Sequence, residues 1–230
     1  MGAAMQGLIH YNIALAHQVD HAQAFLSCGF DAVPSPLGDA DVHVISGPHY
    51  AKRYWLNHPR VLEIDRAWWG DPDCISIGWR QPDGTRKFAS GDAPRNKPEM
   101  QPWTQGEDSC LILADYGQDT ADIEQQARQR FSAVQTRPHP ADKRSETTLE
   151  AAIRAHDVVI GTTGTAIFKA IQMGVPTICL DEKNECWPAC SSMDTPLYRG
   201  DRTQWLHEMS YKQFNLAEIG VAWELLRDIL

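Results

Sequence analysis

The chain has 230 residues, 43% of them hydrophobic, and a formal net charge of −9 at pH 7. This length suits one large α/β domain or two small ones, and the negative charge disfavours nonspecific binding to polyanions. No apolar run approaches the roughly 20 residues that a membrane-spanning helix needs, and the N-terminus lacks the basic and then apolar pattern of a signal peptide. We therefore expect a cytoplasmic protein that does not bind membranes.

The cysteine pattern predicts free thiols. The six cysteines include no Cys-x-x-Cys pair, and Cys28, Cys110 and Cys179 lie in apolar stretches where buried thiols are common. Cys186 and Cys190 lie four residues apart, but a zinc site would need further ligands near them. We expect a reducing compartment, no disulfide and no metal site.

Short apolar runs and helical patterns alternate at the start of the chain, which is typical of a parallel sheet. The expected strands are 8–14, 32–33, 42–45 and 61–64, and the expected helices are 19–30 and 50–57. In parallel sheets, ligands bind at the loops that follow the strands. The candidate side chains in these loops are Asp20, with His17 and His21 beside it, His49, and Asp65, which is followed by Trp68 and Trp69.

A hairpin and a linker follow. Two strands, 75–79 and 86–89, flank the turn residues Pro82-Asp83-Gly84. The stretch 90–106 is rich in Pro, Gly and charge without periodicity, so we expect it to join two domains, 1–105 and 106–230. The hairpin region is locally basic, with Arg80, Arg86, Lys87, Arg95 and Lys97 against Asp83 and Asp92.

The second alternation has the same form. The expected strands are 110–114, 133–136, 158–161 and 177–180, and the expected helices are 119–130, 146–155 and 166–173. Two helical patterns, 203–214 and 217–230, close the chain. Together the two series predict an α/β fold of two small Rossmann-like lobes.

Two loops of the second series are suited to phosphate. Gly161, Thr162, Thr163, Gly164 and Thr165 form a turn before a helix, where backbone N–H groups and hydroxyls favour an anion. Arg137 and His139 follow the preceding strand in the order Arg137-Pro138-His139-Pro140. The alternatives are a plain crossover that uses Gly and Thr as turn residues, and a histidine that supports a turn between two prolines.

The order Arg-x-His-Pro, then a Gly/Thr turn, then Ala170-x-x-x-Gly174-x-Pro176-x-Ile178 resembles glycosyltransferases of the GT-B type. The second half of the chain, 106–230, is also similar to bacterial sialyltransferase-type enzymes and to UDP-GlcNAc 2-epimerases. The resemblance implies two lobes with a cleft between them and closing C-terminal helices. It implies a nucleotide-sugar donor, UDP-linked, bound in 106–230 by Arg137, His139 and the residues of the turn, without a metal or other cofactor.

The sequence departs from that family at Lys169, where many members carry a Glu that contacts the donor. A cation at position 169 would prefer a donor that carries a further phosphate or a carboxylate. The alternative interpretation is that Lys169 is a solvated helix residue without a role in donor binding. An inverting transfer also needs a base from the first lobe, for which Asp65 is the first candidate, then Asp20 and His49. Asp65 beside Arg66 is equally suited to an ion pair, and His49 to a donor phosphate.

For the acceptor, small lobes with Trp-rich loops and a basic segment look like phage-encoded transferases that glycosylate hydroxymethylpyrimidines in DNA. That resemblance implies phosphate contacts from Arg80, Arg86 and Lys87, and stacking on Trp68 and Trp69, in a host cytoplasm. A second interpretation is a saccharide acceptor that stacks on the same tryptophans. A third is a nucleotide-sugar epimerase or hydrolase, and a fourth is a nucleotide- or DNA-binding module with a degenerate site. The oligomeric state stays open.

Overall fold

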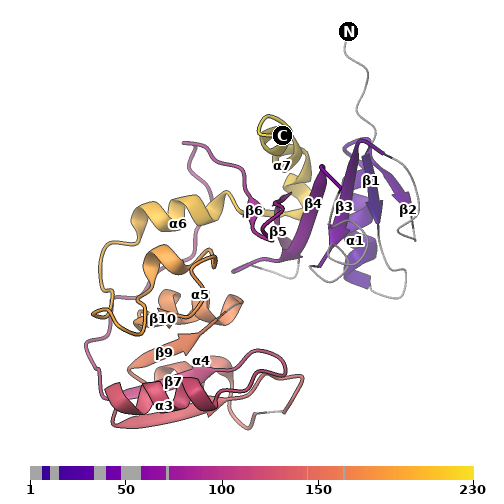
Figure 1. The fold of residues 1–230 in the computed structure, drawn as a ribbon. Helices are drawn as coiled ribbons and strands as arrows, with labels where there is room; N and C mark the ends of the chain where they lie inside the picture. The colour runs from indigo at the N-terminus through magenta and orange to yellow at the C-terminus, as the bar shows by residue number, and fades with distance from the viewer. Residues whose placement is uncertain are drawn as a thin grey trace. The chain divides into compact units, whose positions relative to one another are not determined.

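A computed structural model describes residues 7–10, 16–33, 40–47, 58–70, 73–143, 145–162 and 164–230. The chain forms two compact units (Figure 1). The first unit combines Met1–Asn96 with His207–Leu230, and the second is Lys97–Leu206. Each unit contains its own sheet, so each is described by itself.

The first unit holds a seven-stranded sheet in the order β11-β5-β4-β3-β1-β2, with β6 also paired to β5. The four strands β1 to β4 are parallel, whereas β5 runs antiparallel to β4, and β11 antiparallel to β5. The strands are β1 (Gly7–His10), β2 (Asp31–Val33), β3 (Val42–Ser46), β4 (Val61–Arg66), β5 (Cys74–Arg80), β6 (Arg86–Lys87) and β11 (Gln213–Asn215).

The two faces of this sheet differ in chemistry because side chains alternate along each strand. One face is apolar and packs against α1 (Ala16–Leu26) and α7 (Ile219–Arg227), with Phe25 and Leu226 in its core. The opposite face carries buried polar side chains, which need hydrogen-bond partners. They are His10, His43, Glu63, Ser76 and Gln213, none of them more than 7% exposed.

The C-terminal segment differs from expectation. Helix α6 (Thr203–Ser210) ends early, and the next residues form β11, which extends the first sheet rather than a helix. The 3₁₀ turn η2 (Leu216–Glu218) then leads into α7, whose buried residues join the core of the first unit. Amphipathic periodicity shows that a helix has an apolar face, but not which unit buries it. The last 24 residues therefore belong with the N-terminal half of the chain rather than with 106–206.

The second unit has four parallel strands in the order β10-β9-β7-β8. One face of the sheet packs against α3, and the other face packs against α4 and α5. The elements are β7 (Ser109–Leu113), α3 (Ala121–Arg130), β8 (Ala133–Arg137), α4 (Leu149–Arg154), β9 (Val158–Gly161), α5 (Thr165–Gln172), β10 (Thr177–Cys179) and the 3₁₀ turn η1 (Trp187–Ala189).

Both units share one strand order. Counted along the chain, β2-β1-β3-β4 and β8-β7-β9-β10 are each 2-1-3-4, the order of a doubly wound sheet. This confirms the predicted α/β fold of two Rossmann-like lobes.

The stretch 90–106, expected as a linker, is only partly free. Gln101 N–H donates to Gln172 O (2.8 Å) and Thr104 N–H donates to Gly174 O (2.8 Å), so this part of the stretch packs on the end of α5.

Asp157 ties the start of β9 to the start of β7. Its Oδ2 accepts from Asp108 N–H (3.1 Å), Ser109 N–H (3.0 Å) and Ser109 Oγ–H (2.9 Å). Partial burial favours the neutral carboxyl, but these hydrogen bonds outweigh it and lower the pKa of Asp157 below its ordinary value. The negative form is therefore the one that stabilises the fold.

We expect Asp157→Asn to lower the free energy of unfolding by about 1–2 kcal/mol at pH 7, since it weakens three hydrogen bonds to a partly exposed group. The unfolded carboxyl has a pKa of about 3.9 and the folded one is lower. The stabilisation is thus present above about pH 4 and is lost as the pH falls through the folded-state pKa. Urea unfolding at pH 7 and pH 3 measures both values, with the exposed Asp194→Asn as control; an equal difference at both pH values would contradict this account.

Candidate functional site

The strands of the second sheet end in line. Leu113, the last residue of β7, pairs with Arg137 of β8 on one side and with Gly161 of β9 on the other, and Gly161 pairs with Cys179 of β10. The loops that follow these strands therefore lie along one edge of the sheet. The strand order changes direction between β7 and β9, which is where sheets of this kind bind ligands.

The N-terminus of α5 lies at this position, and its N-cap residue is a glycine, which has no side chain to cap the helix. Its N-cap residue Gly164 has φ 88° and ψ 175°, a backbone region that essentially only glycine occupies. No described side chain accepts from the first-turn N–H groups, and the first turn contains no acidic residue. Gly161 also allows close packing, because a Cβ there would lie 3.3 Å from Ile167 Cγ1. Unpaired N–H groups at a helix N-terminus favour a phosphate.

Thr162 is held by one asparagine and one glutamine side chain, neither of which was predicted from the sequence. Asn184 Nδ2 donates to its carbonyl oxygen (3.0 Å), and Gln118 Nε2 donates to its Oγ1 (3.4 Å). Gln118 Oε1 in turn accepts from Asp115 N–H (2.9 Å). Gln118 thus joins the loop after β7 to the loop after β9. Its place just after an expected strand was the available signal. Thr163 lies outside the described residues.

Arg137 and His139 follow β8, the strand that precedes β9 in the sequence, but β7 lies between β8 and β9 in the sheet. The loop of Arg137 and His139 is therefore separated from the turn by the loop that follows β7. The Arg137 guanidinium donates to the carbonyl oxygen (2.8 Å) and hydroxyl (3.2 Å) of Thr147. His139 Nδ1 accepts from Ala141 N–H (3.2 Å), so neutral His139 carries its proton on Nε2. Its ring lies edge-on to Tyr116 of the β7 loop, with ring centres 5.9 Å apart.

Lys169 lies in the second turn of α5 and pairs with Glu150 of α4. The Nζ to Oε1 distance is 3.5 Å, and the two side chains are 35% and 49% exposed. An ion pair this exposed contributes little to stability. The Lys169 side chain therefore remains partly accessible to solvent, about one helical turn after the N-terminus of α5.

The candidate bases of the first unit are separated. Asp65 is half-buried in β4 and its Oδ1 accepts from Arg66 N–H (2.7 Å). It pairs across the ladder with Ser76, so it belongs to the polar face of the sheet. Asp20 is exposed on α1, the helix that packs on the apolar face. His49 lies outside the described residues. Of the two candidate bases that the structure describes, Asp65 lies on the polar face of the sheet and Asp20 does not.

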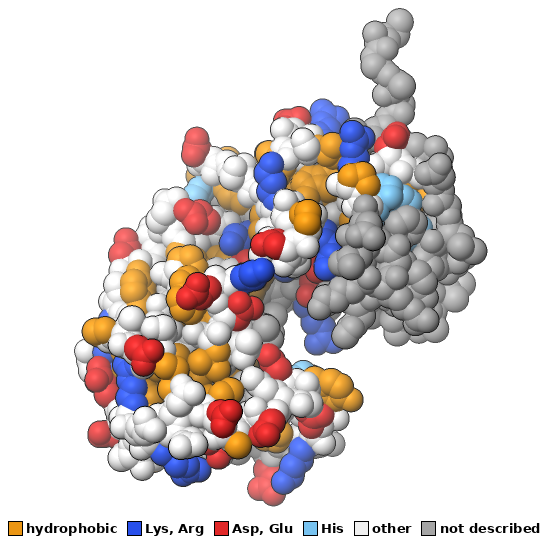
Figure 2. Space-filling view, viewed as in Figure 1, with side chains coloured by type: hydrophobic (Ala, Val, Ile, Leu, Met, Phe, Trp, Pro, Cys, Tyr) orange, Lys and Arg blue, Asp and Glu red, His pale blue; other side chains and the backbone are white. Residues whose placement is uncertain are grey.

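Trp68, Phe88 and Arg86 form an aromatic and cationic group, here named the Trp68 cluster. The two rings lie 6.1 Å apart, and the Arg86 guanidinium lies 5.7 Å from the Trp68 ring and 4.9 Å from the Phe88 ring. Gly78 makes room for it, since a Cβ there would lie 2.9 Å from the Phe88 ring. On the face of the first unit visible in Figure 2, Lys and Arg side chains lie among hydrophobic ones. Phe88 was not among the predicted site residues.

Other residues expected at a phosphate-binding surface are engaged within the fold. Arg80 forms an ion pair with Glu63 (2.5 Å), and the two side chains are only 6% and 7% exposed. Lys87 Nζ donates to Ile229 O (2.8 Å). Trp79, at the end of the same hairpin strand, is buried and its Nε1–H donates to Leu226 O (2.8 Å). The basic segment is therefore not a continuous surface for phosphates.

Among the residues that the structure describes, no three His, Cys, Asp or Glu side chains come together in a way that could hold a metal ion. No helix within the same residues is both long and apolar enough to cross a lipid bilayer. Acidic side chains are scattered over the visible face of the second unit rather than gathered in one patch (Figure 2).

Neither a protein-family model nor a curated protein sequence matches this chain. Solved structures match across nearly its full length. One is KpsC of Thermosulfurimonas dismutans described as a beta Kdo 2,4 transferase, with TM-score 0.52, 12% identity, and coverage of 91% of this chain and 90% of that one. Another is KpsC of the same organism described as a beta Kdo 2,7 transferase, with TM-score 0.55, 10% identity, and coverage of 97% and 100%. At this identity the likeness shows the fold alone, and it agrees with the expected α/β fold of two Rossmann-like lobes.

Proposed function

We propose that this chain is a glycosyltransferase whose second unit binds a nucleotide-sugar donor. The observation that carries the proposal is the uncapped N-terminus of α5 at Gly164, placed where the strand order changes direction. A diphosphate is the donor group that uses several backbone N–H groups at once. The structures of similar fold are both named as sugar transferases, which supports the same reaction class.

In this proposal the chain's own donors stabilise the leaving nucleotide without a metal ion. As the bond between the sugar's anomeric carbon and the phosphate oxygen breaks, negative charge grows on the diphosphate. We propose that the first-turn N–H groups of α5, the hydroxyl of Thr165 and the Nε2–H of His139 stabilise that charge, and that Arg137 adds a cation. The acceptor oxygen forms the new bond and passes its proton to Asp65.

For the acceptor we propose a saccharide ahead of DNA. The internal contacts of Arg80 and Lys87 leave few cations for a phosphate backbone, whose binding needs several. The Trp68 cluster instead offers an aromatic ring beside a cation, which suits a sugar that carries acidic groups. Lys169 beside the donor site similarly suits a donor sugar with a carboxylate, such as the sugar acid Kdo named for the similar structures.

Calorimetric titration with UDP, GDP and CMP tests the donor site. We expect one nucleotide to bind, and His139→Ala to weaken that binding about tenfold, because it removes one donor to a charged group. His207→Ala in the first unit serves as the matched control. Unchanged affinity in the His139 variant would remove this residue from the site.

Incubation of the wild type with nucleotide sugars and either a saccharide panel or hydroxymethylated DNA, read by mass spectrometry, tests the reaction. We expect a new sugar mass on a saccharide. A sugar mass on the nucleoside would establish DNA as the acceptor. Release of nucleotide independent of any acceptor would indicate a hydrolase or epimerase instead. Binding of a nucleotide sugar without any turnover would indicate a binding module.

A further inference from the structure

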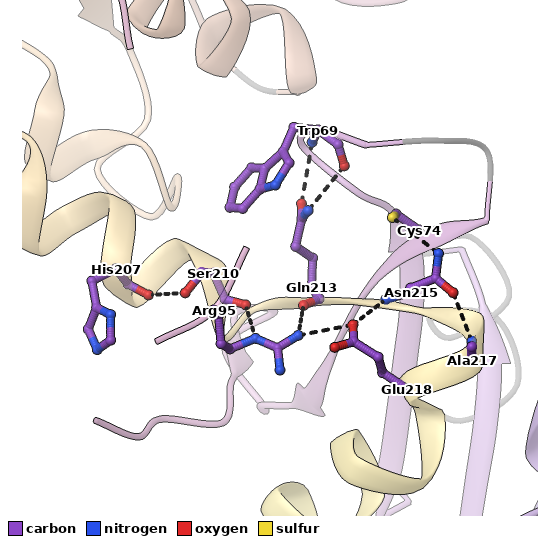
Figure 3. Close-up of polar contacts among 9 residues, drawn as sticks. All are labelled: Trp69, Cys74, Arg95, His207, Ser210, Gln213, Asn215, Ala217 and Glu218. Carbon is purple, nitrogen blue, oxygen red and sulfur yellow. Dashed lines mark hydrogen bonds and ion pairs between the residues drawn. The ribbon is translucent and has the colours of Figure 1, made fainter. Parts of the chain in front are cut away.

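The side chain of Gln213 makes three hydrogen bonds to the backbone of the loop that follows β4, and Figure 3 shows the two that join it to Trp69. Its Oε1 accepts from Trp68 N–H (2.9 Å) and from Trp69 N–H (3.3 Å), and its Nε2 donates to Trp69 O (3.0 Å). Gln213 is only 6% exposed, so water competes little for these groups. One side chain thus determines where two consecutive residues of the loop lie.

Gln213 is itself held firmly. It pairs with Ser76 in the ladder between β11 and β5. Arg95 Nε donates to Ser210 O (2.8 Å), and its Nη2 donates to Gln213 O (3.3 Å) and to Glu218 Oε2 (3.3 Å). Figure 3 shows Arg95 between these groups, joining segments far apart in the sequence. The C-terminal segment is therefore a rigid support for the loop rather than a loose end.

The loop position matters because of the side chains on it. Trp68 contributes its ring to the Trp68 cluster, where it lies 6.1 Å from Phe88 and 5.7 Å from the Arg86 guanidinium. The same loop begins directly after Asp65 and Arg66 at the end of β4. A displacement of the loop backbone would move the Trp68 ring away from Arg86 while leaving the sheet intact.

We propose that Gln213 is a positioning residue for acceptor binding: it places Trp68, and through it the Trp68 cluster, without touching the acceptor. This inference rests on the proposed function. A misplacement of about 1 Å in a binding group is enough to weaken a reaction by as much as 100-fold. The effect falls on the acceptor, because the donor groups lie in the other unit.

Gln213→Leu has nearly the same shape and loses all three hydrogen bonds. We expect it to raise the KM for the saccharide acceptor about tenfold or more, with kcat and the Kd of the donor nucleotide within about twofold of the wild type. Gln213→Glu keeps an oxygen for both N–H groups but replaces the donor to Trp69 O by a carboxylate oxygen, so its KM should also rise above that of the wild type. Gln23→Leu, at an exposed glutamine of α1, is the control for a surface change.

The acceptor KM, kcat and donor Kd distinguish a failure of the positioning role of Gln213 from a failure of the proposed function. If the wild type transfers sugar and a folded Gln213→Leu has an unchanged acceptor KM, the positioning role is overturned and the proposed function stands. If Gln213→Leu does not fold, Gln213→Glu decides in the same way. A parallel fall in kcat and in donor affinity would indicate general loss of structure and overturn the positioning role. If nucleotide binds but the wild type transfers no sugar, the proposed function fails, and this inference fails with it.

Discussion

Gly164→Ala should weaken binding of the donor nucleotide by about 100-fold, while costing about 1–3 kcal/mol of unfolding free energy. Gly164 has φ 88° and ψ 175°, and a Cβ is not tolerated in this region of backbone space. Space is not the limit, since apart from the chain neighbours of Gly164 no described residue lies within 4 Å of the added Cβ. The strain is relieved only by rotating the peptide groups that lead into α5, which turns the first N–H groups away from a bound phosphate.

Gly84→Ala is the matched control for this variant. Gly84 also has φ 88° and open space around it, but it lies in the hairpin turn between β5 and β6 of the first unit. We expect it to lose stability and to keep nucleotide affinity. Calorimetry measures the Kd and urea unfolding the stability of both variants. If Gly164→Ala binds the nucleotide as tightly as Gly84→Ala does, the N-terminus of α5 is not the donor site.

The second large effect concerns stability. Arg80→Met is expected to lower the free energy of unfolding by about 3–5 kcal/mol, because it leaves Glu63 charged and unpaired in a buried position. Among the described residues, Arg80 Nε has no hydrogen-bond partner, so the ion pair with Glu63 is the main compensation for burying this charge. Urea unfolding of the variant against the wild type measures the loss.

The double variant Glu63→Leu with Arg80→Met distinguishes the cost of an unpaired charge from the contribution of the ion pair itself. It removes both charges, and we expect it to recover most of the stability lost in the single variant. The Arg80→Met variant also tests whether Arg80 contacts a DNA acceptor. If Arg80→Met keeps wild-type stability but loses affinity for hydroxymethylated DNA, Arg80 contacts DNA as the sequence first indicated, and the ion pair is not its role.

Most elements were predictable because their signals are local. The hairpin follows from Pro82-Asp83-Gly84, and Gly84 has the positive φ such a turn requires. The strand-turn-helix at Gly161 to Gly174 follows from a β-branched run, then small residues, then helical spacing. Helix ends were less accurate: α4 begins at Leu149 after its N-cap Thr148, later than expected, because the hydroxyl of Thr148 accepts from Ala151 N–H (3.1 Å) and defines the start.

The candidate site was predictable only in part. The turn before α5 was predicted, because glycine and threonine before a helix are a local pattern, while its role as a donor site stays a prediction. Gln118 and Gln213 were not, since each acts on a loop distant in sequence, and a lone glutamine carries no signal of that partner. The burial of Arg80 was missed for a similar reason: a basic residue in a charged segment looks exposed until its buried partner Glu63 is known.

The sequence by itself determined the kinds of elements, their order and the α/β class, because hydrophobic periodicity and turn chemistry depend on residues a few positions apart. The tertiary structure decided what depends on contacts between distant segments. It placed β7 between the two phosphate-binding candidates and added β11 to the first sheet. It also used the C-terminal segment to hold the loop of Trp68 and Trp69. These choices follow from which apolar faces and backbone groups satisfy one another across the whole chain, and no local pattern encodes them.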